Sequence, residues 1–544
     1  MHQPTLGLIQ HHLGASPGYT LFAPLKSETT YLINLEGEVV HSWESDLPPG
    51  NSVFLLKDGS LLRTARVDDP PVFHGGGQGG RLRLFSWGGD LLWEFHVADE
   101  SRLHHHDVCP LPNGNILVLA WEGKSREEAI SLGRDPEEVG EEGLWPDCVL
   151  EIKPLPPDGA EIVWEWHAWD HLIQDSDPSL PGYGDPAMNP GRVDIHAGLD
   201  RPIESPEEME RLAALGYAGA PPEPDHGPPG DRRGGPNRGR ADWFHTNSIS
   251  WNPELDQILL SVRRLNEVWI IDHGITTNEA AGSRGEILYR WGNPAAWKQG
   301  GSKDRQLFGQ HHATWVNDPN GISGIQVFNN GEDRPEGPWS SVDAWALPLQ
   351  KDGSYHREVG KAFGPGSFSW SLSGPGVRGF HSPRISSAQR LANGNTLVCS
   401  GEQGWFFEVT RGGAVVWEYK NPFGGEKEGR EGRRGRRGPG GGMPGKAVFR
   451  AERISPDHPG LVGRDPLRQP QGRSCPSQPR RHRGRRRGAV LQGPHRHRKR
   501  LLRAPRRHIQ PRARGPGDVF DPHRPALGAG LPDGPVPRLL SDRA

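Results

Sequence analysis

Four histidine-containing stretches have the residue types and the spacing to form one chemical site. They read LHHHDV, DWFHTNS, QHHATW and GFHSP, and each comes shortly before a turn rich in Asn, Asp and Gly. His106 and His245 both lie seven residues before the Asn of their turns, and His312 lies at nearly the same distance before the turn at 318–321. Imidazole at one register of several equivalent strands can act as a general acid or base, as a nucleophile or as a metal ligand.

Other polar residues lie close to these histidines in the sequence. Asp107 directly follows His106, and we expect it to orient an imidazole by accepting a hydrogen bond from the second ring nitrogen. Asn247 offers a neutral hydrogen-bond donor. Arg334 lies in the turn-rich loop FNNGEDRPEG, and an arginine at a converging site favours an oxyanion with several acceptor oxygens. Together His and Arg suit the transfer of an anionic group such as a sulfuryl or phosphoryl group.

The chain lacks the sequence signatures of nucleotide and structural-metal sites. It contains no GxxxxGK[ST] motif, and the Gly-rich stretch at 75–85 is not followed by a helical pattern. Its four cysteines are scattered and form no CxxC pair, so that free thiols are expected. We therefore expect no nucleotide cosubstrate, no other cofactor and no metal.

Two short phrases recur along the chain and define the elements that must position these residues. The first is a Gly-led turn followed by β-forming residues and a Trp, and a weaker copy lies at 351–363. The tryptophans are Trp43, Trp93, Trp164, Trp291 and Trp417. The second phrase is mostly an Asn-Gly or Asp-Gly turn between apolar runs, a strong hairpin signal because both turn residues must reach positive φ. Six antiparallel units at intervals of about 50–70 residues predict an all-β, six-bladed β-propeller over 17–425.

A propeller would bring the histidines together. The innermost strand of each blade runs along a central channel, so that equivalent residues of successive blades form a ring around one axis. His106, His245 and His312 are therefore expected to meet at a common axial cavity. At the same register, the first and last repeats carry Asn51 and Ser386.

The long insertion at 170–241 interrupts the repeats. It is rich in Pro, Gly and charged residues, and we expect it to form a loop or lid on one face. Within it, SPEEMERLAALGYA predicts a short helix with Ser205 as the N-cap, Pro206 at the first helical position and Glu208 closing a capping box.

The composition changes after residue 425. Residues 426–544 carry 30 Lys or Arg and 10 Asp or Glu, although the whole chain has a formal net charge of -3. We predict a low-complexity linker at 426–446. Residues 447–544 are expected to be a disordered basic tail or the product of a frameshifted reading, although 447–465 still reads like ordinary protein sequence. A nucleic-acid-binding arm is the weaker interpretation of such a tail, and no nucleic-acid partner is expected.

No membrane or export signal is visible in the sequence. There is no apolar run of about 18 residues, and the first residues lack a basic segment followed by an apolar one. From this alone a cytoplasmic protein without a membrane partner is expected.

Longer motifs occur in a characteristic order along the chain. They read PGYTLFAPLKSETTYLINLEGEVVHSW, HHDVCPLPNGNILVLAWE, DWFHTNSISW, QHHATW, FNNGEDR and SSAQRLANGNTLVCSG. In this order they resemble the arylsulfate sulfotransferase family, over roughly residues 17–425. The resemblance implies a six-bladed propeller that moves a sulfuryl group from a phenolic sulfate donor to a phenolic acceptor, through a sulfohistidine and in a ping-pong sequence. It also implies a periplasmic location; the oligomeric state stays open, a homodimer being one option.

The resemblance also implies roles for individual residues. The catalytic residues expected by motif are His245, His312, Arg334 and His381, the last as the nucleophile. Those expected to bind substrate are His106, Asn247 and His311. If His381 does not reach the channel, His312 would be the nucleophile, or the chain would have lost transferase activity. Two other functions stay open: a non-catalytic binding platform, and a metalloenzyme with His105, His106, His245 and His312 as ligands.

Overall fold

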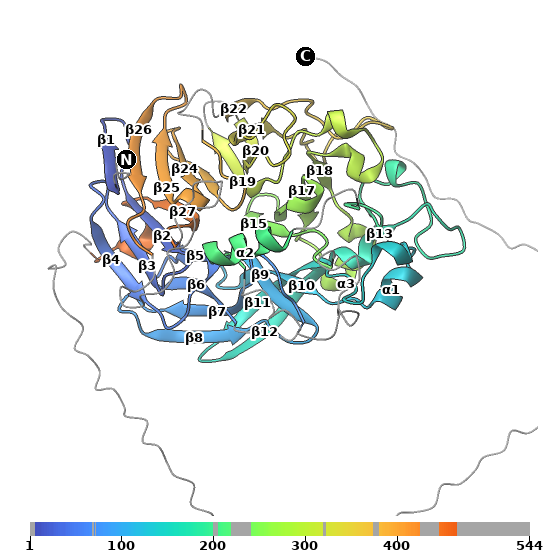
Figure 1. The fold of residues 1–544 in the computed structure, drawn as a ribbon, viewed down its shortest axis with the longest axis horizontal. Helices are drawn as coiled ribbons and strands as arrows, with labels where there is room; N and C mark the ends of the chain where they lie inside the picture. Colours follow the sequence, from blue (N-terminus) through green and yellow to red (C-terminus); the bar gives the residue numbers. More distant parts are fainter. Residues whose placement is uncertain are drawn as a thin grey trace, which may run out of the picture. The chain divides into compact units, whose positions relative to one another are not determined.

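The computed structural model of the chain describes residues 6–67, 70, 72–199, 205–218, 241–318, 322–373, 380–424 and 445–464. They belong to one compact unit, Met1–Gln471. Six antiparallel sheets surround a central axis in this unit, which confirms the predicted all-β six-bladed propeller (Figure 1). The part of the basic tail that follows residue 464 lies outside the described residues, as do the linker residues 426–444.

Each blade has four strands, and the sixth has a fifth strand at its outer edge. From the axis outward, blade 1 contains β27 (Val448–Ile454), β2 (Tyr19–Pro24), β3 (Thr29–Ile33) and β4 (Val39–Glu44). Blade 2 contains β5 (Pro49–Leu55), β6 (Leu61–Arg66), β7 (Gly80–Phe85) and β8 (Leu91–His96). Blade 3 contains β9 (Arg102–Pro110), β10 (Ile116–Glu122), β11 (Asp147–Leu155) and β12 (Gly159–His167).

The second half of the ring follows the same plan. Blade 4 contains β15 (Thr246–Asn252), β16 (Gln257–Val262), β17 (Glu267–Asp272) and β18 (Tyr289–Trp291). Blade 5 contains β19 (His311–Asp318), β20 (Ile322–Asn329), β21 (Ser341–Ala346) and β22 (Trp370–Ser373). Blade 6 contains β23 (Ser387–Arg390), β24 (Thr396–Ser400), β25 (Trp405–Val409), β26 (Val415–Lys420) and β1 (Gly7–His11).

Few helices accompany the blades in the described residues. The α-helices are α1 (Arg126–Ser131), α2 (Pro206–Leu215) and α3 (Thr277–Ala280). The 3₁₀ helices used below are η4 (Arg263–Leu265), η6 (Pro294–Trp297), η7 (Ser302–Asp304) and η9 (Gly401–Gln403). The insertion also contains a short parallel strand pair, β13 (Leu172–Ile173) and β14 (Val193–Asp194). No described helix has both the length and the apolar composition to cross a bilayer.

Two strands from opposite ends of the described chain, β1 and β27, close the ring. β27 pairs with β2 as the innermost strand of blade 1, and β1 pairs with β26 at the outer edge of blade 6. The predicted domain boundaries at 17 and 425 leave out both strands. Neither strand carries the Gly-turn–Trp phrase from which the repeats were recognised, and β27 is separated from blade 6 by the low-complexity segment 426–446, so that sequence repetition could not assign them to blades.

The repeated tryptophans join neighbouring blades. Each is buried on the fourth strand of its blade and donates its indole N–H to a backbone carbonyl of the next blade. The pairs are Trp43 with Ser86 (3.2 Å), Trp93 with Gly159 (2.8 Å), Trp164 with Ile275 (2.9 Å), Trp291 with Pro365 (2.8 Å) and Trp417 with Leu35 (2.8 Å). The sequence repeat therefore marks the contact between blades, because a buried indole N–H needs an acceptor.

The weak sixth copy of the phrase does not form the strand expected of it. Residues 351–363 contain no strand, and β22 supplies the fourth strand of blade 5 instead. The segment YHREVGKAF lacks a run of β-forming residues that ends in Trp, and a bridge between Leu349 and Tyr355 closes a turn there. The number of blades was predicted correctly, but this strand was placed wrongly.

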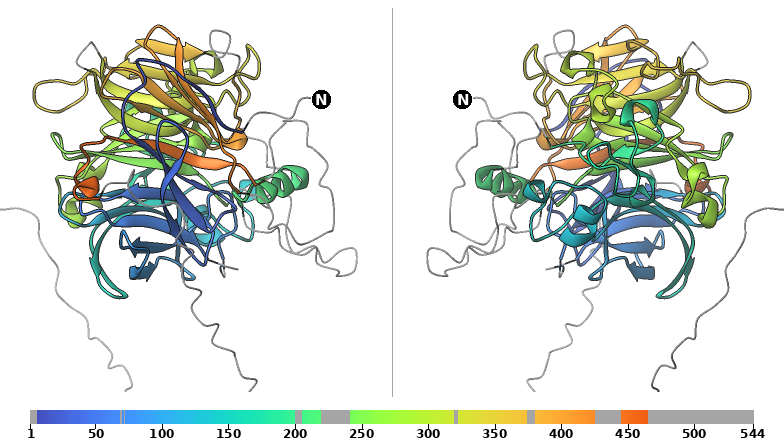
Figure 2. Two further views of the ribbon diagram at one scale, coloured as in Figure 1. Left: turned by 90° about the vertical axis from the view of Figure 1, so that its left-hand side faces the viewer. Right: turned by 90° about the vertical axis from the view of Figure 1, so that its right-hand side faces the viewer.

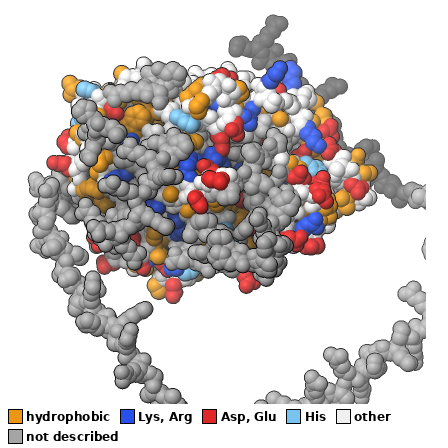
Figure 3. Space-filling model, viewed as in Figure 1, with side chains coloured by type: hydrophobic (Ala, Val, Ile, Leu, Met, Phe, Trp, Pro, Cys, Tyr) orange, Lys and Arg blue, Asp and Glu red, His pale blue; other side chains and the backbone are white. Residues whose placement is uncertain are grey.

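The α2 segment (residues 205–218) lies over the centre of the ring, as the prediction of a lid on one face requires. Figure 1 shows α2 across the middle of the blades, and Figure 2 shows it on one face of them. On this face, acidic side chains lie next to Lys and Arg side chains near the centre (Figure 3). Ser205 caps the helix by accepting from the backbone N–H of Glu208 at 3.2 Å, whereas the Glu208 carboxylate binds Arg211 and Arg384.

Removing β27 tests ring closure. Val448, Phe449 and Ile454 are buried in the ring, and each buried side chain of this size contributes roughly 1.5–3 kcal/mol. A chain that ends after residue 464 should unfold at the temperature of the full chain. A chain that ends after residue 424 should lose its cooperative transition, as measured by circular dichroism and tryptophan fluorescence. Equal melting temperatures for the two truncated chains would contradict a closing role for β27.

Candidate functional site

The register deduced from the turns is visible in the backbone. All five residues at this register have positive φ: Asn51 (93°), His106 (55°), His245 (52°), His312 (52°) and Ser386 (94°). Only a few per cent of residues other than glycine adopt this region, so its recurrence in five blades is a shared structural device. The β9–β10 and β19–β20 ladders also skip residues around His106 and His312. The prediction that these residues are structurally equivalent is confirmed.

Two of the three histidines meet around one phenolic oxygen. The Tyr217 hydroxyl lies 2.5 Å from Nε2 of His106 and 3.0 Å from Nε2 of His245. The centroids of the two imidazoles are 4.5 Å apart. Tyr217 directly follows the C-terminal end of α2, so the insertion supplies the residue that joins blades 3 and 4 at the centre of the ring.

Hydrogen bonds extend this contact in both directions. Nδ1 of His245 lies 2.5 Å from Oδ2 of Asp242. On the other side, Nδ1 of His106 lies 2.7 Å from Nδ1 of His105, whose Nε2 lies 3.3 Å from Oδ1 of Asp147 without a hydrogen bond. The result is a hydrogen-bonded chain of three imidazoles and one phenol that ends at Asp242. Such a chain can move a proton and fixes the orientation of every ring in it.

The tautomers in this chain give the two Nε2 atoms different roles. Nδ1 of His245 donates to Asp242, so its Nε2 is an acceptor, and the Tyr217 hydroxyl donates to it. The phenolic oxygen can then accept from Nε2 of His106, whose Nδ1 accepts from Nδ1 of His105, so that neutral imidazoles satisfy all four contacts. His245, bonded directly to a carboxylate, is the better placed of the two to take up a proton. Burial lowers the pKa of His106 well below its usual value, and the neighbouring His245 and His105 lower it further.

The Gly-rich stretch lies against these rings. A Cβ on Gly77 would lie 2.1 Å from Nε2 of His106, and one on Gly76 would lie 2.6 Å from Cε1 of Tyr217. The Gly77 carbonyl accepts from the backbone N–H of His106 at 2.7 Å and from the Asn51 side chain at 3.0 Å. The glycines are therefore required by the close approach of backbone to the histidines.

His311 lies near this pair and has one ring nitrogen without a partner. Its Nδ1 lies 2.8 Å from Oδ1 of Asn330 and 3.1 Å from the Gly309 carbonyl, and both atoms can only accept from a ring N–H. Nε2 therefore carries the lone pair, and it is buried without a hydrogen-bond partner among the described residues. Burial lowers the pKa of His311 to about 3, and the charge of Arg263 acts in the same direction.

His312 and Asn247 make other contacts than those expected. Nδ1 of His312 lies 3.0 Å from the Ala388 carbonyl of blade 6, and burial together with the charge of Arg450 lowers its pKa. Asn247 donates to the Gln310 carbonyl at 2.7 Å, which joins blade 4 to blade 5. The contacts recorded for the two side chains join blades, and none involves the His106–His245 pair.

Asp107 does not orient an imidazole. Arg450 of β27 binds it with both terminal nitrogens, at 3.1 and 2.6 Å, and the pair is buried. Asp107 also accepts from the Ser52 hydroxyl at 2.5 Å and from the backbone N–H of Ile249 at 3.2 Å. Asp107 thereby ties β27 to blades 2, 3 and 4.

Arg334 lies against aromatic rings in blade 5. Its guanidinium is 3.7 Å from the centroid of Trp339 and 5.0 Å from that of Phe308, and Nη2 donates to the Ser341 hydroxyl at 3.1 Å. Phe308 lies just before β19, Trp339 lies just before β21, and Ser341 is the first residue of β21. None of these contacts brings the Arg334 guanidinium to the His106–His245 pair. Burial lowers its pKa.

His381 lies beside the α2 segment. It is partly buried ahead of β23, and its backbone carbonyl accepts from Gln403 at 3.1 Å. Burial lowers the pKa of its imidazole, and the charge of Arg211 on α2 lowers it further. The recorded contacts place His381 near α2, but none joins its ring to His106 or His245.

Sequence reasoning missed four residues of the site. They are Tyr217, Asp242, Arg263 and Arg450. Asp242 stands three residues before His245, and a carboxylate at that spacing could have been recognised as a partner of the imidazole. Tyr217 and Arg450 come from the insertion and the tail, for which no repeat gave a position. Arg263 is buried and binds Glu332 at 2.8 Å, and its charge lowers the pKa of both His106 and His311.

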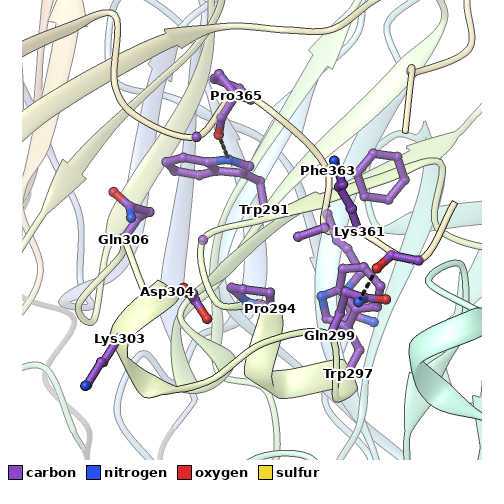
Figure 4. Close-up of a pocket in the computed structure, with 15 residues that line it drawn as sticks. Trp291, Pro294, Trp297, Gln299, Lys303, Asp304, Gln306, Lys361, Phe363 and Pro365 are labelled. Atoms are coloured by element: carbon purple, nitrogen blue, oxygen red, sulfur yellow. Dashed lines mark hydrogen bonds between the residues drawn. The ribbon is translucent and has the colours of Figure 1, made fainter. Parts of the chain in front are cut away.

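A cavity of about 390 Å³ lies elsewhere, between blades 4 and 5. Figure 4 shows Trp291, Trp297 and Phe363 in its wall, with the Trp291 indole bonded to Pro365. The lining comes from β18, from η6 and η7 and from 360–366, and not from the innermost strands. It is therefore separate from the histidine site. Within the part of the chain that the structure describes, no group of three His, Cys, Asp or Glu side chains is arranged to hold a metal ion.

Comparisons with known proteins point to one family. The family model described as arylsulfotransferase (ASST) matches residues 24–422. No curated protein matches the chain. A protein of unknown function from Bacteroides caccae is 13% identical with a TM-score of 0.37, over 74% of this chain and 94% of its own. The periplasmic gluconolactonase PpgL of Pseudomonas aeruginosa is 11% identical with a TM-score of 0.35, over 74% and 96%. Virginiamycin B lyase from Staphylococcus aureus is 10% identical with a TM-score of 0.30, over 76% and 87%.

Replacing Arg450 tests the buried ion pair. Arg450→Met should lower the free energy of unfolding by about 3–5 kcal/mol, because Asp107 is then left buried without its counter-charge. The double variant Arg450→Met/Asp107→Asn should recover a large part of that loss. Urea denaturation of the single and double variants measures both effects. Additive losses in the double variant would contradict the direct coupling.

Acid stability should depend on the buried histidines. His104 accepts the Gly80 N–H at Nδ1, and burial lowers its pKa to about 3, whereas the unfolded chain has a value of about 6.5. The unfolded state therefore binds more protons below pH 6.5, and stability is lost as the pH falls from there toward 3. His104→Leu should reduce this slope by about 1.4 kcal/mol per pH unit, as measured by urea denaturation at several pH values. An unchanged slope in His104→Leu would contradict this contribution of the buried imidazole.

Proposed function

Because the chain belongs to the arylsulfotransferase (ASST) family, we propose that it transfers a sulfuryl group from a phenolic sulfate ester to a phenolic acceptor. The observation that carries this proposal is the convergence of two imidazole Nε2 atoms, from His106 and His245, on the oxygen of a phenol. A phenolic oxygen is the atom that leaves sulfur in the first half of such a reaction and attacks it in the second.

The two imidazoles would handle the proton of both half-reactions. In the first, the S–O bond of the aryl sulfate breaks, and protonated His245 gives its proton to the departing phenolate oxygen. In the second, the acceptor phenol returns a proton to the same imidazole as its oxygen bonds to sulfur. Asp242 holds His245 in the required orientation and stabilises its charged form.

Arg263 is proposed to support the sulfuryl oxygens. It is buried, and its charge lowers the pKa of His106 and His311, so negative charge on a group held by these histidines would be stabilised by its guanidinium. The role that the family resemblance gives to Arg334 remains a proposal, as do substrate contacts of His312 and Asn247. Arg263 is preferred to Arg334 for this role because its charge lowers the pKa of His106 and His311, whereas the contacts of Arg334 lie in blade 5.

Two histidines are candidates for the covalent intermediate. His381 is the nucleophile implied by motif, and its position beside Arg211 would suit an anionic group. His311 is favoured by its tautomer, because Nε2 has a lone pair and no partner among the described residues. In either case a nitrogen–sulfur bond forms as the donor S–O bond breaks, and it is cleaved when the acceptor oxygen attacks.

Transfer itself is tested with 4-nitrophenyl sulfate as donor and phenol as acceptor. The purified protein should release 4-nitrophenol at a rate that depends on phenol. His245→Ala and His106→Ala should each lower kcat/KM by about 10²–10⁴, the usual contribution of a general acid or base. His96→Ala, an exposed imidazole on β8, should leave the rate unchanged. A correctly folded protein that is inert with a range of aryl sulfates would favour the binding-platform function.

The nucleophile is identified without acceptor. Incubation with excess donor, alkaline quenching and peptide mass spectrometry should reveal one added sulfuryl group on a histidine. His381→Ala abolishes the adduct if the motif assignment is right, and His311→Gln abolishes it if the tautomer identifies the nucleophile. Release of 4-nitrophenol that requires phenol, without any histidine adduct in the wild type, would instead support direct transfer between the two substrates.

The compartment follows only from the family. We propose a periplasmic location, and fractionation of cells that express the full-length gene tests it. Recovery of the protein with cytoplasmic markers would contradict it.

A further inference from the structure

Tyr217 places a phenol of the chain itself in the proposed reaction site. Its hydroxyl occupies both Nε2 atoms, and the side chain is 1% exposed. A phenolic oxygen from outside would need the same two nitrogens. Tyr217 and a phenolic substrate are therefore mutually exclusive at this position.

The site accommodates the Tyr217 ring as well as its hydroxyl. The ring centroid lies 5.6 Å from that of His106 and 6.3 Å from that of His245, at tilted or edge-on angles. Cβ-free backbone at Gly76 borders the ring, and the Gly77 N–H donates to the Tyr217 carbonyl at 2.9 Å. A space lined in this way fits one aromatic ring with a hydroxyl directed at the imidazoles.

Ion pairs hold the α2 segment over this space. Arg211 binds Glu402 of η9 through both terminal nitrogens, each at 2.9 Å. Glu208 lies 3.3 Å from Arg384, and the Arg66 guanidinium donates to the Ala218 carbonyl at 3.2 Å. Water can replace such polar partners when the segment leaves, so that these contacts suit a reversible closure better than a permanent one.

The segment also makes an apolar contact with the ring. Its buried side chains pack in one cluster with side chains of the ring: Leu212, Leu215, Tyr217 and Ala218 against Leu25, Ile385, Ala447 and Phe449. A buried tyrosine that serves packing alone needs only one acceptor for its hydroxyl. Tyr217 instead contacts an acid–base pair whose other nitrogens are both fixed by hydrogen bonds, and it comes from a segment that ion pairs also attach to the ring.

We propose that Tyr217 is an internal pseudosubstrate: it occupies the phenol position between His106 and His245, and the α2 segment must move away before a phenolic substrate binds. This inference rests on the proposed function, because that function identifies the position as the one for a phenolic oxygen. The protein is then closed in its resting state, and its phenolic substrates compete with a residue of its own chain.

Weakening the contact of Tyr217 with the two imidazoles should increase the affinity for a phenolic substrate. Tyr217→Phe keeps the ring but removes the hydroxyl, and it should tighten the binding of 4-nitrophenol about tenfold, the equivalent of one hydrogen bond. Arg211→Gln loosens the α2 segment without touching the hydroxyl and should change binding in the same direction. Glu210→Gln, on an exposed position of α2, is the matched control and should bind like the wild type. Equilibrium titration of the full-length protein measures all four affinities.

Hydrogen exchange reports the motion itself. In the wild type, 4-nitrophenol should accelerate amide exchange in 206–217 and leave the blades protected. Equal 4-nitrophenol affinities in wild type and Tyr217→Phe, or unchanged exchange at saturating 4-nitrophenol, would overturn the pseudosubstrate. A fall in turnover with Tyr217→Phe, together with unchanged affinity, would also overturn it, by identifying the hydroxyl as part of the catalytic machinery. Because binding and exchange need no turnover, a protein without transferase activity would refute the proposed function while leaving the displacement result intact.

Discussion

The ion pair of Arg450 and Asp107 is the interaction on which the centre of the ring depends. Its two charges are buried, so each requires the other, and the carboxylate also accepts from Ser52 and from the backbone N–H of Ile249. One aspartate thus joins the innermost strands of blades 1, 2, 3 and 4. Since Asp107 follows His106 on the same strand, the contact that fixes these blades also fixes the backbone from which a site imidazole projects.

Two periodic features recur in the ring, each in five of the six blades, one at the outer part of the blade and one at its inner edge. On the fourth strands, an indole N–H bonds the next blade and sets the spacing of the sheets. On or just before the innermost strands of five blades, a residue with positive φ bends the chain. A bend of this kind directs a side chain out of the regular alternation of the strand, which explains how His106 and His245, from neighbouring blades, can meet at one oxygen. The positive-φ residue recurs in five blades, whereas the proposed transfer uses side chains from only some of these blades.

The sequence predicted the structural features that repeat from blade to blade, but it did not predict the features that occur only once. Turn residues and tryptophans predicted the blades, and counting back from the turns identified His106 and His245 correctly as members of one cluster. His312 shares their register and backbone conformation, yet its ring contacts blade 6, because the register of a residue does not set the direction of its side chain. Arg334 was chosen from a loop motif, whereas Trp339 and Phe308 of the same region stack on it and hold it in blade 5.

The residues that sequence reasoning missed share a physical reason. Tyr217 and Arg450 reach the centre from an insertion and from a strand near the end of the described chain, and Arg450 is more than three hundred positions from its partner. Contacts between residues so far apart in the sequence leave no local pattern of apolar or turn residues. They can therefore be identified only in the folded ring. The Gly-rich stretch at 75–85 was noticed, but its purpose depended on which rings would lie against it.

The position of β27 has a consequence for the way the protein is made. The strands β2, β3 and β4 of blade 1 are translated before blades 2 to 5, yet the innermost strand of blade 1, β27, is translated after the strands of every other blade. Until β27 is translated, β2 has no partner strand at its inner edge, and Asp107 lacks the positive charge of Arg450. A chain translated only through blade 6 therefore lacks the strand that closes the ring and the arginine that pairs with Asp107.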